Sequence, residues 1–204
     1  MRLGIFGGSF NPVHSGHVAL ARHFLKQLSL DKIIIIPALI APHKLQGRLT
    51  APRDRLNMCR LAFPEDCFEV SDIEINRGGK SYTIDTLAQL RAAYPDDEFY
   101  LLIGADMLLY FDKWHRWRDI ADEAYICAAV RNDSPDEYAQ LEKYTFSALS
   151  DIKQRVILSG TKPFEVSSTE IREKIRSGGA FESLVPPAVA QYIKDVGLYA
   201  ADCP

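Results

Sequence analysis

The sequence predicts an α/β protein whose mostly parallel, doubly wound sheet is covered by helices on both faces. Short apolar segments that end at Gly or Pro alternate along the chain with segments of helical periodicity. The apolar segments show little alternation with polar residues, which is typical of strands buried on both faces. Because helices separate most of these strands, parallel pairing is favoured.

The first part of the chain contains two strand-helix units. RLGIF at 2–6 predicts the first strand, and a Gly-Gly loop leads from it to a helix over about 16–29. KIIII at 32–36 predicts the second strand, and a helix over about 51–62 follows it. These units predict two neighbouring parallel strands joined by a helix.

The remaining elements follow with more variation. We expect, in order, a strand at 68–75, a helix at 82–94, a strand at 98–103 and a short strand near 125–130. The polar stretch 131–154 predicts an exposed helix or an excursion from the core, and plain surface fits it as well. After a strand near 155–158, a helix over 167–177 begins with hydroxyl residues suited to an N-cap, and a final helix follows Pro186-Pro187.

Length and charge predict one domain and a small-molecule partner. The chain has 204 residues, of which 47% are hydrophobic, and its formal net charge is −3. We expect a single domain over 1–204, with a C-terminal helical portion from about residue 167 packed on it. Since the net charge provides no basic field for a long polyanion, no nucleic-acid partner is expected.

No membrane or targeting segment is expected either. The longest apolar run, IIIIPALIAP at 33–42, is shorter than the roughly 20 apolar residues that span a bilayer. The N-terminus has no basic region followed by a long apolar run. Four cysteines stand far apart without a CxxC pair, so we expect free thiols and a cytoplasmic protein. The sequence does not indicate the oligomeric state.

The loop after the first strand has the features of a phosphate-binding site. It reads GGSFNPVHSGH from Gly7 to His17. Glycines let backbone N–H groups approach an anion, the start of a helix adds partial positive charge, and two imidazoles can donate to phosphoryl oxygens. If the helix begins near Ser15, His14 and His17 point to the same side. Alone, a glycine loop also fits a tight turn, and a lone histidine also fits the surface or the core.

This loop resembles the signature of the nucleotidyltransferase superfamily, in which an HxGH element lies on the ATP phosphates in a Rossmann-like fold. His14 and His17 match that element, while Asn11 stands where many relatives have Asp. A second superfamily element, Ser-Ser-Thr-x-Ile-Arg, resembles residues 167–172. Hydroxyls at a helix start with a guanidinium one turn later suit β- and γ-phosphates, although an ordinary capped helix would look the same.

Further strings resemble the nicotinate mononucleotide adenylyltransferase branch of this superfamily. They are KSYTIDTL at 80–87, GADML at 104–108 with FDKWHRW at 111–117, the C-terminal pattern from Leu184 to Tyr199, and Pro42-His43-Lys44, which resembles a loop near the triphosphate. Gly104 directly follows a predicted strand, and ligands of open α/β sheets bind beyond the carboxyl ends of strands.

The resemblance implies three sets of site residues. Catalytic roles fall on His14, His17 and Arg172. ATP binding falls on Gly7, Gly8, Ser9, Phe10, His14, His17, Lys44, Gly104, Asp106, Ser167, Ser168, Thr169 and Arg172. Mononucleotide binding falls on Tyr82, Thr86, Trp114 and His115, with Trp114 stacked on the pyridine ring and backbone N–H groups near it on the nicotinate carboxylate. Either tryptophan could instead be core, and Trp117 fits the core better.

The implied reaction transfers AMP from ATP to nicotinate mononucleotide, which gives nicotinate adenine dinucleotide and pyrophosphate. The 5′-phosphate attacks the α-phosphorus in line, so no covalent enzyme intermediate is needed. Mg²⁺ is expected to arrive on the ATP phosphates, and no protein ligand for a metal is named.

Other functions remain open from the sequence. The acceptor could be nicotinamide mononucleotide, phosphopantetheine or a sugar or alcohol phosphate, although the 80–87 and 111–117 strings disfavour the last two. A non-catalytic nucleotide sensor is disfavoured by the intact His14, His17 and Arg172. An RNA-handling enzyme like a class I aminoacyl-tRNA synthetase is disfavoured by size, charge and the lack of a KMSKS-like loop.

Overall fold

A parallel sheet of six strands forms the centre of the computed structural model, which describes residues 1–41, 49–131, 135–161 and 166–200. The strands are β1 (Arg2–Gly8), β2 (Lys32–Pro37), β3 (Phe68–Val70), β4 (Glu98–Gly104), β5 (Ala124–Arg131) and β6 (Val156–Thr161). They are ordered β3-β2-β1-β4-β5-β6, and every neighbouring pair is parallel. The predicted parallel α/β fold is therefore confirmed.

The chain reverses its direction of travel across the sheet between β1 and β4. From β1 it moves outward through β2 to β3, and it then returns to place β4 on the other side of β1. The register of β1 and β4 pairs Leu3 with Phe99 and Ile5 with Leu101. In open α/β sheets, ligands bind in the crevice where the strand order reverses, so the carboxyl ends of β1 and β4 mark the expected site.

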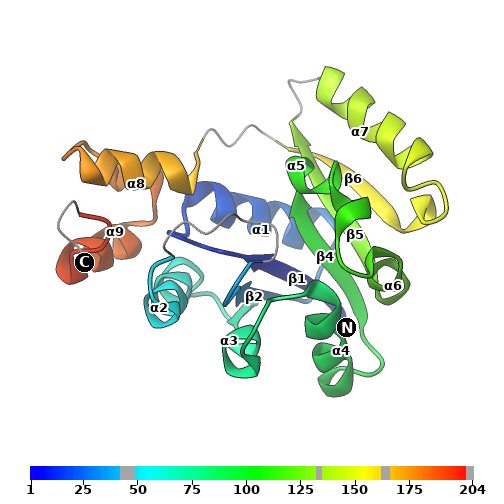
Figure 1. The fold of residues 1–204 in the computed structure, drawn as a ribbon, viewed down its shortest axis with the longest axis horizontal. Helices are drawn as coiled ribbons and strands as arrows, with labels where there is room; N and C mark the ends of the chain where they lie inside the picture. The colour runs from blue at the N-terminus through cyan, green and yellow to red at the C-terminus, as the bar shows by residue number, and fades with distance from the viewer. Residues whose placement is uncertain (42–48, 132–134, 162–165, 201–204) are drawn as a thin grey trace.

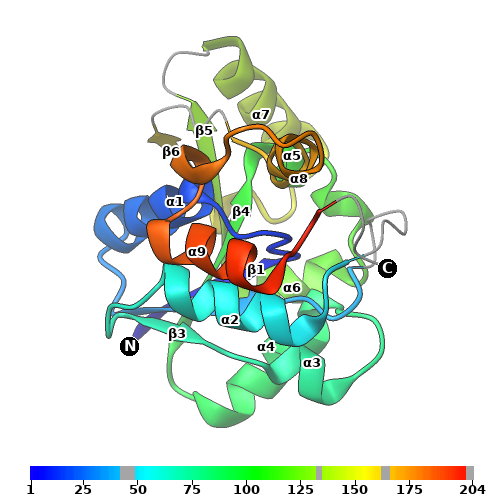
Figure 2. The same cartoon turned by 90° about the vertical axis from the view of Figure 1, so that its left-hand side faces the viewer.

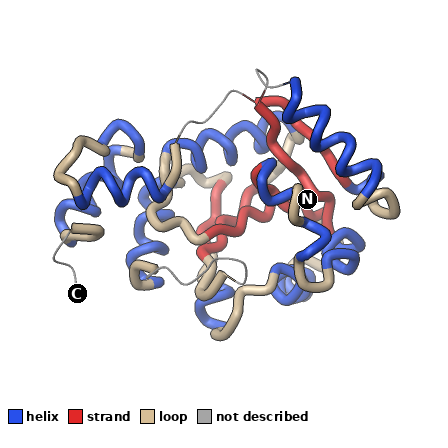
Figure 3. The backbone as a smooth tube through the Cα atoms, turned by 45° about the horizontal axis from the view of Figure 1, so that its top comes forward, coloured by secondary structure: helices blue, strands red, loops and turns tan. Residues whose placement is uncertain are grey.

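Helices cover both faces of the sheet (Figures 1 and 3). They are α1 (Ser15–Gln27), α2 (Pro52–Ala62), α3 (Ile73–Arg77), α4 (Thr83–Ala93), α5 (Ala105–Leu108), α6 (Trp117–Glu123), α7 (Pro135–Ser147), α8 (Ser168–Arg176) and α9 (Pro187–Val196), with 3-10 turns η1 (Phe111–Lys113), η2 (Lys153–Arg155) and η3 (Glu182–Leu184). Figure 2 shows α9 lying beside α2, so the C-terminal helical portion packs on the strand-helix units at the start of the chain.

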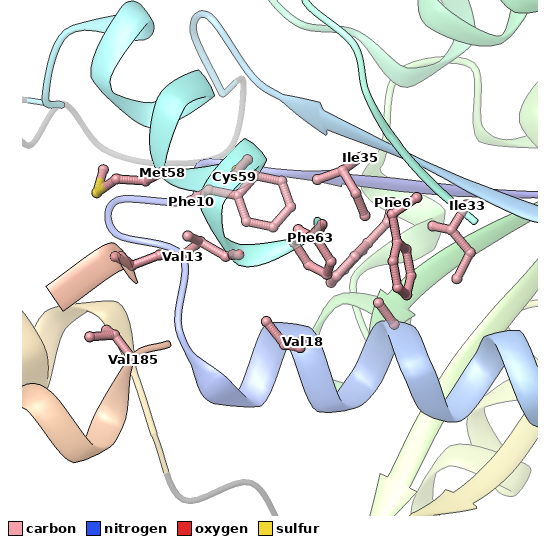
Figure 4. Packing of buried hydrophobic residues seen from close by; sticks show 14 of the residues in the cluster. Phe6, Phe10, Val13, Val18, Ile33, Ile35, Met58, Cys59, Phe63 and Val185 are labelled. Atoms are coloured by element: carbon pink, nitrogen blue, oxygen red, sulfur yellow. The ribbon is translucent and has the colours of Figure 1, made fainter. Parts of the chain in front are cut away.

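Two apolar cores form because successive side chains of a strand point to opposite faces. In β2, Ile33 and Ile35 join the core under α1, α2, α8 and α9, whereas Ile34 and Ile36 join the core under α4, α5, α6 and α7. Figure 4 shows the first core, in which Phe6 and Phe10 pack toward α1 and α2. The strands lack polar alternation because both faces are buried, as the sequence predicted.

The predicted strand at 68–75 is wrong beyond Val70. Residues Ile73–Arg77 instead form α3, which begins after Asp72 and ends at Gly78. Gly78 has φ +75°, a conformation that costs glycine little and ends the helix. Alternating apolar residues in FEVSDIEI imitate a strand, but the polar pair Ser71-Asp72 separates two elements.

The polar stretch after β5 contains α7, which agrees with one of the two structures expected there. Its residues Leu141 and Thr145 are buried, and Leu141 joins the core on the α4 side of the sheet. Most of its other side chains are exposed.

The described cysteines are free, in agreement with the sequence. Burial raises the pKa of Cys127 to about 12 and raises that of Cys59 further, so both thiols stay protonated. Cys203 lies outside the described residues. Within the described ranges, every helix is too short or too polar to cross a membrane.

A fully buried arginine ties three segments of the fold together. Arg55 of α2 donates from Nη1 to the carbonyl oxygens of Ser9 at 2.9 Å and Ala38 at 2.6 Å, and from Nε to that of Thr50 at 3.0 Å. Burial lowers the pKa of this guanidinium. Ser9 follows β1 and Ala38 follows β2, so Arg55 fixes the carboxyl ends of two neighbouring strands.

We expect Arg55→Met to lower the free energy of unfolding by about 3 kcal/mol or more, because three buried carbonyls lose a charged donor. Urea unfolding measures the change. Arg53→Met, on the same helix but at an exposed position, is the control and should stay within about 0.5 kcal/mol of wild type. Equal effects of the two substitutions would contradict the role of Arg55.

Candidate functional site

A cavity of about 430 Å³ opens at the carboxyl ends of β1 and β4. One side is formed by the loop after β1 and the start of α1, and the opposite side by the start of α4 and the segment around η1. The end of β4 and residues from α3 and α8 complete the wall. This volume falls in the range of small-molecule sites, and its position is the one that the strand order predicts.

His14 and His17 form the N-terminal cap of α1. His14 has an extended backbone and precedes Ser15, the first residue of the helix. Nδ1 of His14 accepts from the N–H of His17 at 3.4 Å, and Nδ1 of His17 accepts from the N–H of His14 at 3.2 Å. The ring centroids are 3.6 Å apart. With both Nδ1 atoms turned to the backbone, each Nε2 remains on the far edge of its ring, and the prediction that the two imidazoles share one side is confirmed.

The turn before these histidines is held by aromatic packing. Phe10 has φ +44°, a left-handed conformation that is uncommon outside glycine, and its side chain is only 1% exposed. Its ring lies 5.5 Å from Phe6 and 5.0 Å from His17, centroid to centroid. At Gly8 an added Cβ would come within 3.0 to 3.2 Å of the Phe10 ring. Glycine at position 8 therefore lets the loop fold closely over Phe10.

The second sequence motif docks onto the same loop. Oγ of Ser168 donates to the carbonyl oxygen of Pro12 at 2.9 Å, and Nη1 of Arg172 donates to that of Asn11 at 2.8 Å. Ser167 caps α8 by accepting from the N–H of Glu170 at 3.1 Å. Two motifs that lie about 150 residues apart in the sequence thus meet through side-chain to backbone hydrogen bonds.

The side chain of Asn11 connects this loop to the C-terminal segment. Its Oδ1 accepts from the N–H of Thr50 at 3.2 Å and from the hydroxyl of Tyr199 at 3.0 Å. Burial raises the pKa of Tyr199 to about 12, so the phenol keeps its proton and donates. Asn11 acts as an acceptor that shapes the loop, and an Asp at this position could accept the same two hydrogen bonds.

Gly104 and Asp106 lie at the end of β4 on the same cavity. An added Cβ on Gly104 would come within 2.5 Å of Oδ1 of Asp106, so glycine leaves room for the carboxylate in its present position, and a larger residue would require that carboxylate to move. Both residues lie at the carboxyl end of a strand, as the sequence predicted, and the strand order places that end beside the end of β1.

The opposite wall is aromatic. The rings of Tyr82 and His115 lie 4.5 Å apart, centroid to centroid, and Trp114 packs on Phe111 at 5.4 Å. Trp117 is also half-buried and packs on Phe111 at 6.2 Å, so both tryptophans touch the core, but only Trp114 lines the cavity among the described residues.

The structure gathers most of the residues that the sequence singled out. Those lining the cavity are Gly7, Gly8, Ser9, Phe10, His14, His17, Tyr82, Thr86, Gly104, Asp106, Trp114, His115 and Ser168. Arg172, Ser167 and Thr169 lie at or near the loop without lining the cavity, and Arg172 also donates to Oγ1 of Thr169 at 3.1 Å. Lys44 lies outside the described residues.

Sequence reasoning missed the contribution of α3. Glu74 lines the cavity although its side chain is only 6% exposed. Ser81 also lines it, and in the sequence it appeared only as one letter of the string at 80–87. A correct placement of Glu74 required recognising α3, which the apparent strand pattern concealed.

Within the described ranges, no three His, Cys, Asp or Glu side chains cluster as a metal site.

Comparison with known families and proteins agrees with this geometry. The profile of the family described as cytidylyltransferase-like matches residues 5–174. A protein of Geobacillus thermodenitrificans (strain NG80-2), named "Probable nicotinate-nucleotide adenylyltransferase", is 38% identical over 201 residues, covering 98% of this chain and 87% of that protein. One of Synechococcus sp. (strain JA-3-3Ab) with the same name is 38% identical over 199 residues, covering 97% and 94%.

Solved structures share the fold. The chain superposes on Plasmodium falciparum nicotinic acid mononucleotide adenylyltransferase complexed with NaAD with a TM-score of 0.73 at 19% identity, covering 97% of each chain. The complex of the same protein with APC gives a TM-score of 0.70 at 18% identity, covering 97% of this chain and 96% of that one.

We expect Asn11→Leu to lower the free energy of unfolding by about 2–4 kcal/mol, because the Thr50 N–H and the Tyr199 hydroxyl lose their buried acceptor. Asn11→Asp keeps the acceptor and should stay within about 1 kcal/mol of wild type at neutral pH. Urea unfolding at pH 7 compares the two. If Asp costs as much as Leu, the Asn11 amide group holds the loop through its N–H₂ and not through Oδ1.

Proposed function

We propose, since this chain belongs to the cytidylyltransferase-like family and within it to the nicotinate-nucleotide adenylyltransferases, that its cavity joins ATP and nicotinate mononucleotide. The products are nicotinate adenine dinucleotide and pyrophosphate. The observation that carries the proposal is the close pair of imidazoles at the start of α1, whose ring centroids lie 3.6 Å apart where the strand order reverses, next to α8.

The loop side of the cavity suits the triphosphate. The start of α1 carries partial positive charge, and His14 and His17 stand beside it with their Nδ1 atoms in the capping bonds. Gly7, Gly8, Ser9 and Phe10 contribute backbone. The β- and γ-phosphates would contact Ser167, Ser168, Thr169, Arg172 and Lys44. The ribose and the adenine edge of ATP would contact Gly104 and Asp106.

Catalysis then rests on positioning and charge. The 5′-phosphate of the mononucleotide attacks the α-phosphorus, the bond to the bridging oxygen breaks in line, and pyrophosphate leaves with the electron pair. His14 and His17 hold the phosphate oxygens as negative charge grows on the leaving group, and the arginine supplies positive charge at its far end. No group of the protein becomes covalently bonded.

The aromatic wall suits the pyridine ring. Trp114 offers an indole face, and the rings of Tyr82 and His115, which are tilted against each other, line the same cavity. Thr86 lies deeper on the α4 side of the cavity. Backbone N–H groups near Trp114 and His115 would receive the nicotinate carboxylate, which favours the acid over the amide.

Mg²⁺ fits this site as a companion of ATP. The ion keeps several waters and binds substrate phosphates readily, and the loop side offers imidazoles and backbone N–H groups instead of a carboxylate cage. When bound it would neutralise phosphate charge.

Two alternatives keep the same cavity. Nicotinamide mononucleotide could replace the acid if the carboxylate meets no donors near Trp114. A nucleotide sensor would bind ATP without turnover.

We expect pyrophosphate release from Mg²⁺-ATP to be at least about 10-fold faster with nicotinate mononucleotide than with nicotinamide mononucleotide at equal subsaturating concentrations, because charge-assisted hydrogen bonds to the carboxylate are worth about 1.5–3 kcal/mol. A coupled pyrophosphate assay measures both rates. Equal rates would keep the transferase but remove the carboxylate site, and release with neither would exclude both pyridine acceptors.

We expect His17→Ala to lower kcat by about 10²–10³, since one donor to the developing charge is lost. His23→Ala is a matched control on the same helix, because His23 contacts Ser159 at 2.8 Å and does not line the cavity. Thermal unfolding of both variants separates loss of the α1 cap from loss of chemistry. A sensor would instead show weaker ATP binding in the variant and no turnover in wild type.

A further inference from the structure

A carboxylate without a role in the proposed chemistry lies in the cavity wall. Glu74 of α3 is 6% exposed and lines the cavity together with Thr86 of α4. Figure 2 shows α3 and α4 side by side on the same flank of the sheet. A charged side chain that is buried this deeply requires partners.

One oxygen of Glu74 is already engaged. Oγ1 of Thr86 donates to Oε1 of Glu74 at 2.7 Å, and it accepts from Nη1 of Arg77 at 3.1 Å. Arg77 is in turn held by Oε1 of Gln89 at 2.8 Å. The carboxylate is therefore fixed in one orientation by a chain of hydrogen bonds that runs between α3 and α4.

The other oxygen is available to a ligand. Oε2 of Glu74 accepts no hydrogen bond from the described residues, and it is not among the side-chain oxygens that are sealed from solvent. Because the side chain lines the cavity and is otherwise buried, this oxygen faces the cavity. An ionised carboxylate only accepts hydrogen bonds, so its partner must be a donor.

The chemistry of the mononucleotide limits which donor this is. Its phosphate and its nicotinate carboxylate are anions that Glu74 repels, which leaves the two ribose hydroxyls as neutral donors. Carboxylates bind ribose hydroxyls in other dinucleotide-binding α/β folds as well. The hydroxyl of Thr86 is already engaged, because it also lies in donor range of the carbonyl oxygen of Tyr82 at 3.3 Å and accepts from Arg77. Oε2 of Glu74 is therefore the acceptor of this group that a ligand can reach.

We propose that Oε2 of Glu74 accepts a hydrogen bond from a ribose hydroxyl of the pyridine mononucleotide. This inference rests on the proposed function and adds a specificity-determining residue to it. It also predicts that the site disfavours a mononucleotide that carries a phosphate on that ribose hydroxyl, because the added anion would face a buried carboxylate.

The test combines a protein substitution with a ligand substitution. KM and kcat are measured for nicotinate mononucleotide and for its 2′-deoxy and 3′-deoxy analogues, with wild type, Glu74→Ala and Glu74→Gln. Asp72→Ala is the control, since it removes the same charge beside the same helix and makes no side-chain cap bond. Calorimetric titration with nicotinate mononucleotide measures binding without turnover.

We expect Glu74→Ala to raise KM for nicotinate mononucleotide by about 10- to 100-fold with KM for ATP unchanged. For one deoxy analogue, KM with wild type should be raised by a similar factor, and Glu74→Ala should raise it little further. Glu74→Gln, which retains a neutral acceptor, should fall between wild type and Glu74→Ala.

Three results would overturn the inference. If Glu74→Ala raises KM equally for nicotinate mononucleotide and both deoxy analogues, Glu74 has only a structural role. If Glu74→Ala leaves KM unchanged, Glu74 makes no contact with the mononucleotide. If nicotinamide mononucleotide is assayed in the same way and its KM alone rises in Glu74→Ala, the carboxylate contacts the amide group instead of the ribose. The proposed function fails separately, if wild type neither binds nor adenylylates nicotinate mononucleotide.

Discussion

The site depends on the way in which the backbone of one loop is held. Three carbonyl oxygens of the loop after β1 each accept from a side chain of another helix, namely Ser9 from Arg55 of α2, Asn11 from Arg172 of α8 and Pro12 from Ser168 of α8. Carbonyls that are bonded away from the cavity do not compete with an anion for the N–H groups at the start of α1. Helices that are distant in sequence therefore hold the loop in the conformation in which, under the proposed function, it would bind phosphate.

These contacts also place positive charge behind the loop. Among the described residues, neither a lysine nor an arginine lines the cavity, while Arg55 and Arg172 touch the loop from its outer side. A guanidinium that donates to backbone carbonyls still contributes its field to the space beyond them, and a low dielectric strengthens that field. Under the proposed function the imidazoles would contact the ligand, while the two arginines hold the loop and their charge favours an anion upon it.

Sequence could predict the parts of the site whose geometry is local. The start of α1 at Ser15 follows from a capping arrangement within four residues, and the position of Gly104 follows from the strand before it. The role of Arg55 was not predictable, because an arginine in an amphipathic helix is usually exposed and its partners come from two other segments. Glu74 was missed because the alternation in FEVSDIEI resembles a strand, whereas the helix packs on β2 and is joined to α4 by side-chain hydrogen bonds that the local pattern does not reveal.

The two sides of the cavity carry opposite chemistry, and this asymmetry can sort the ends of a ligand. His14 and His17 stand on the loop side, whereas Glu74 and Asp106 line the cavity from α3 and from the end of β4. A phosphate near either carboxylate would be repelled in a medium that screens charge poorly, while a hydroxyl there gains an acceptor. Under the proposed function, two nucleotides bound with their phosphates together at the loop and their riboses toward the carboxylates would satisfy both conditions at once. That arrangement would also bring a 5′-phosphate to an α-phosphorus.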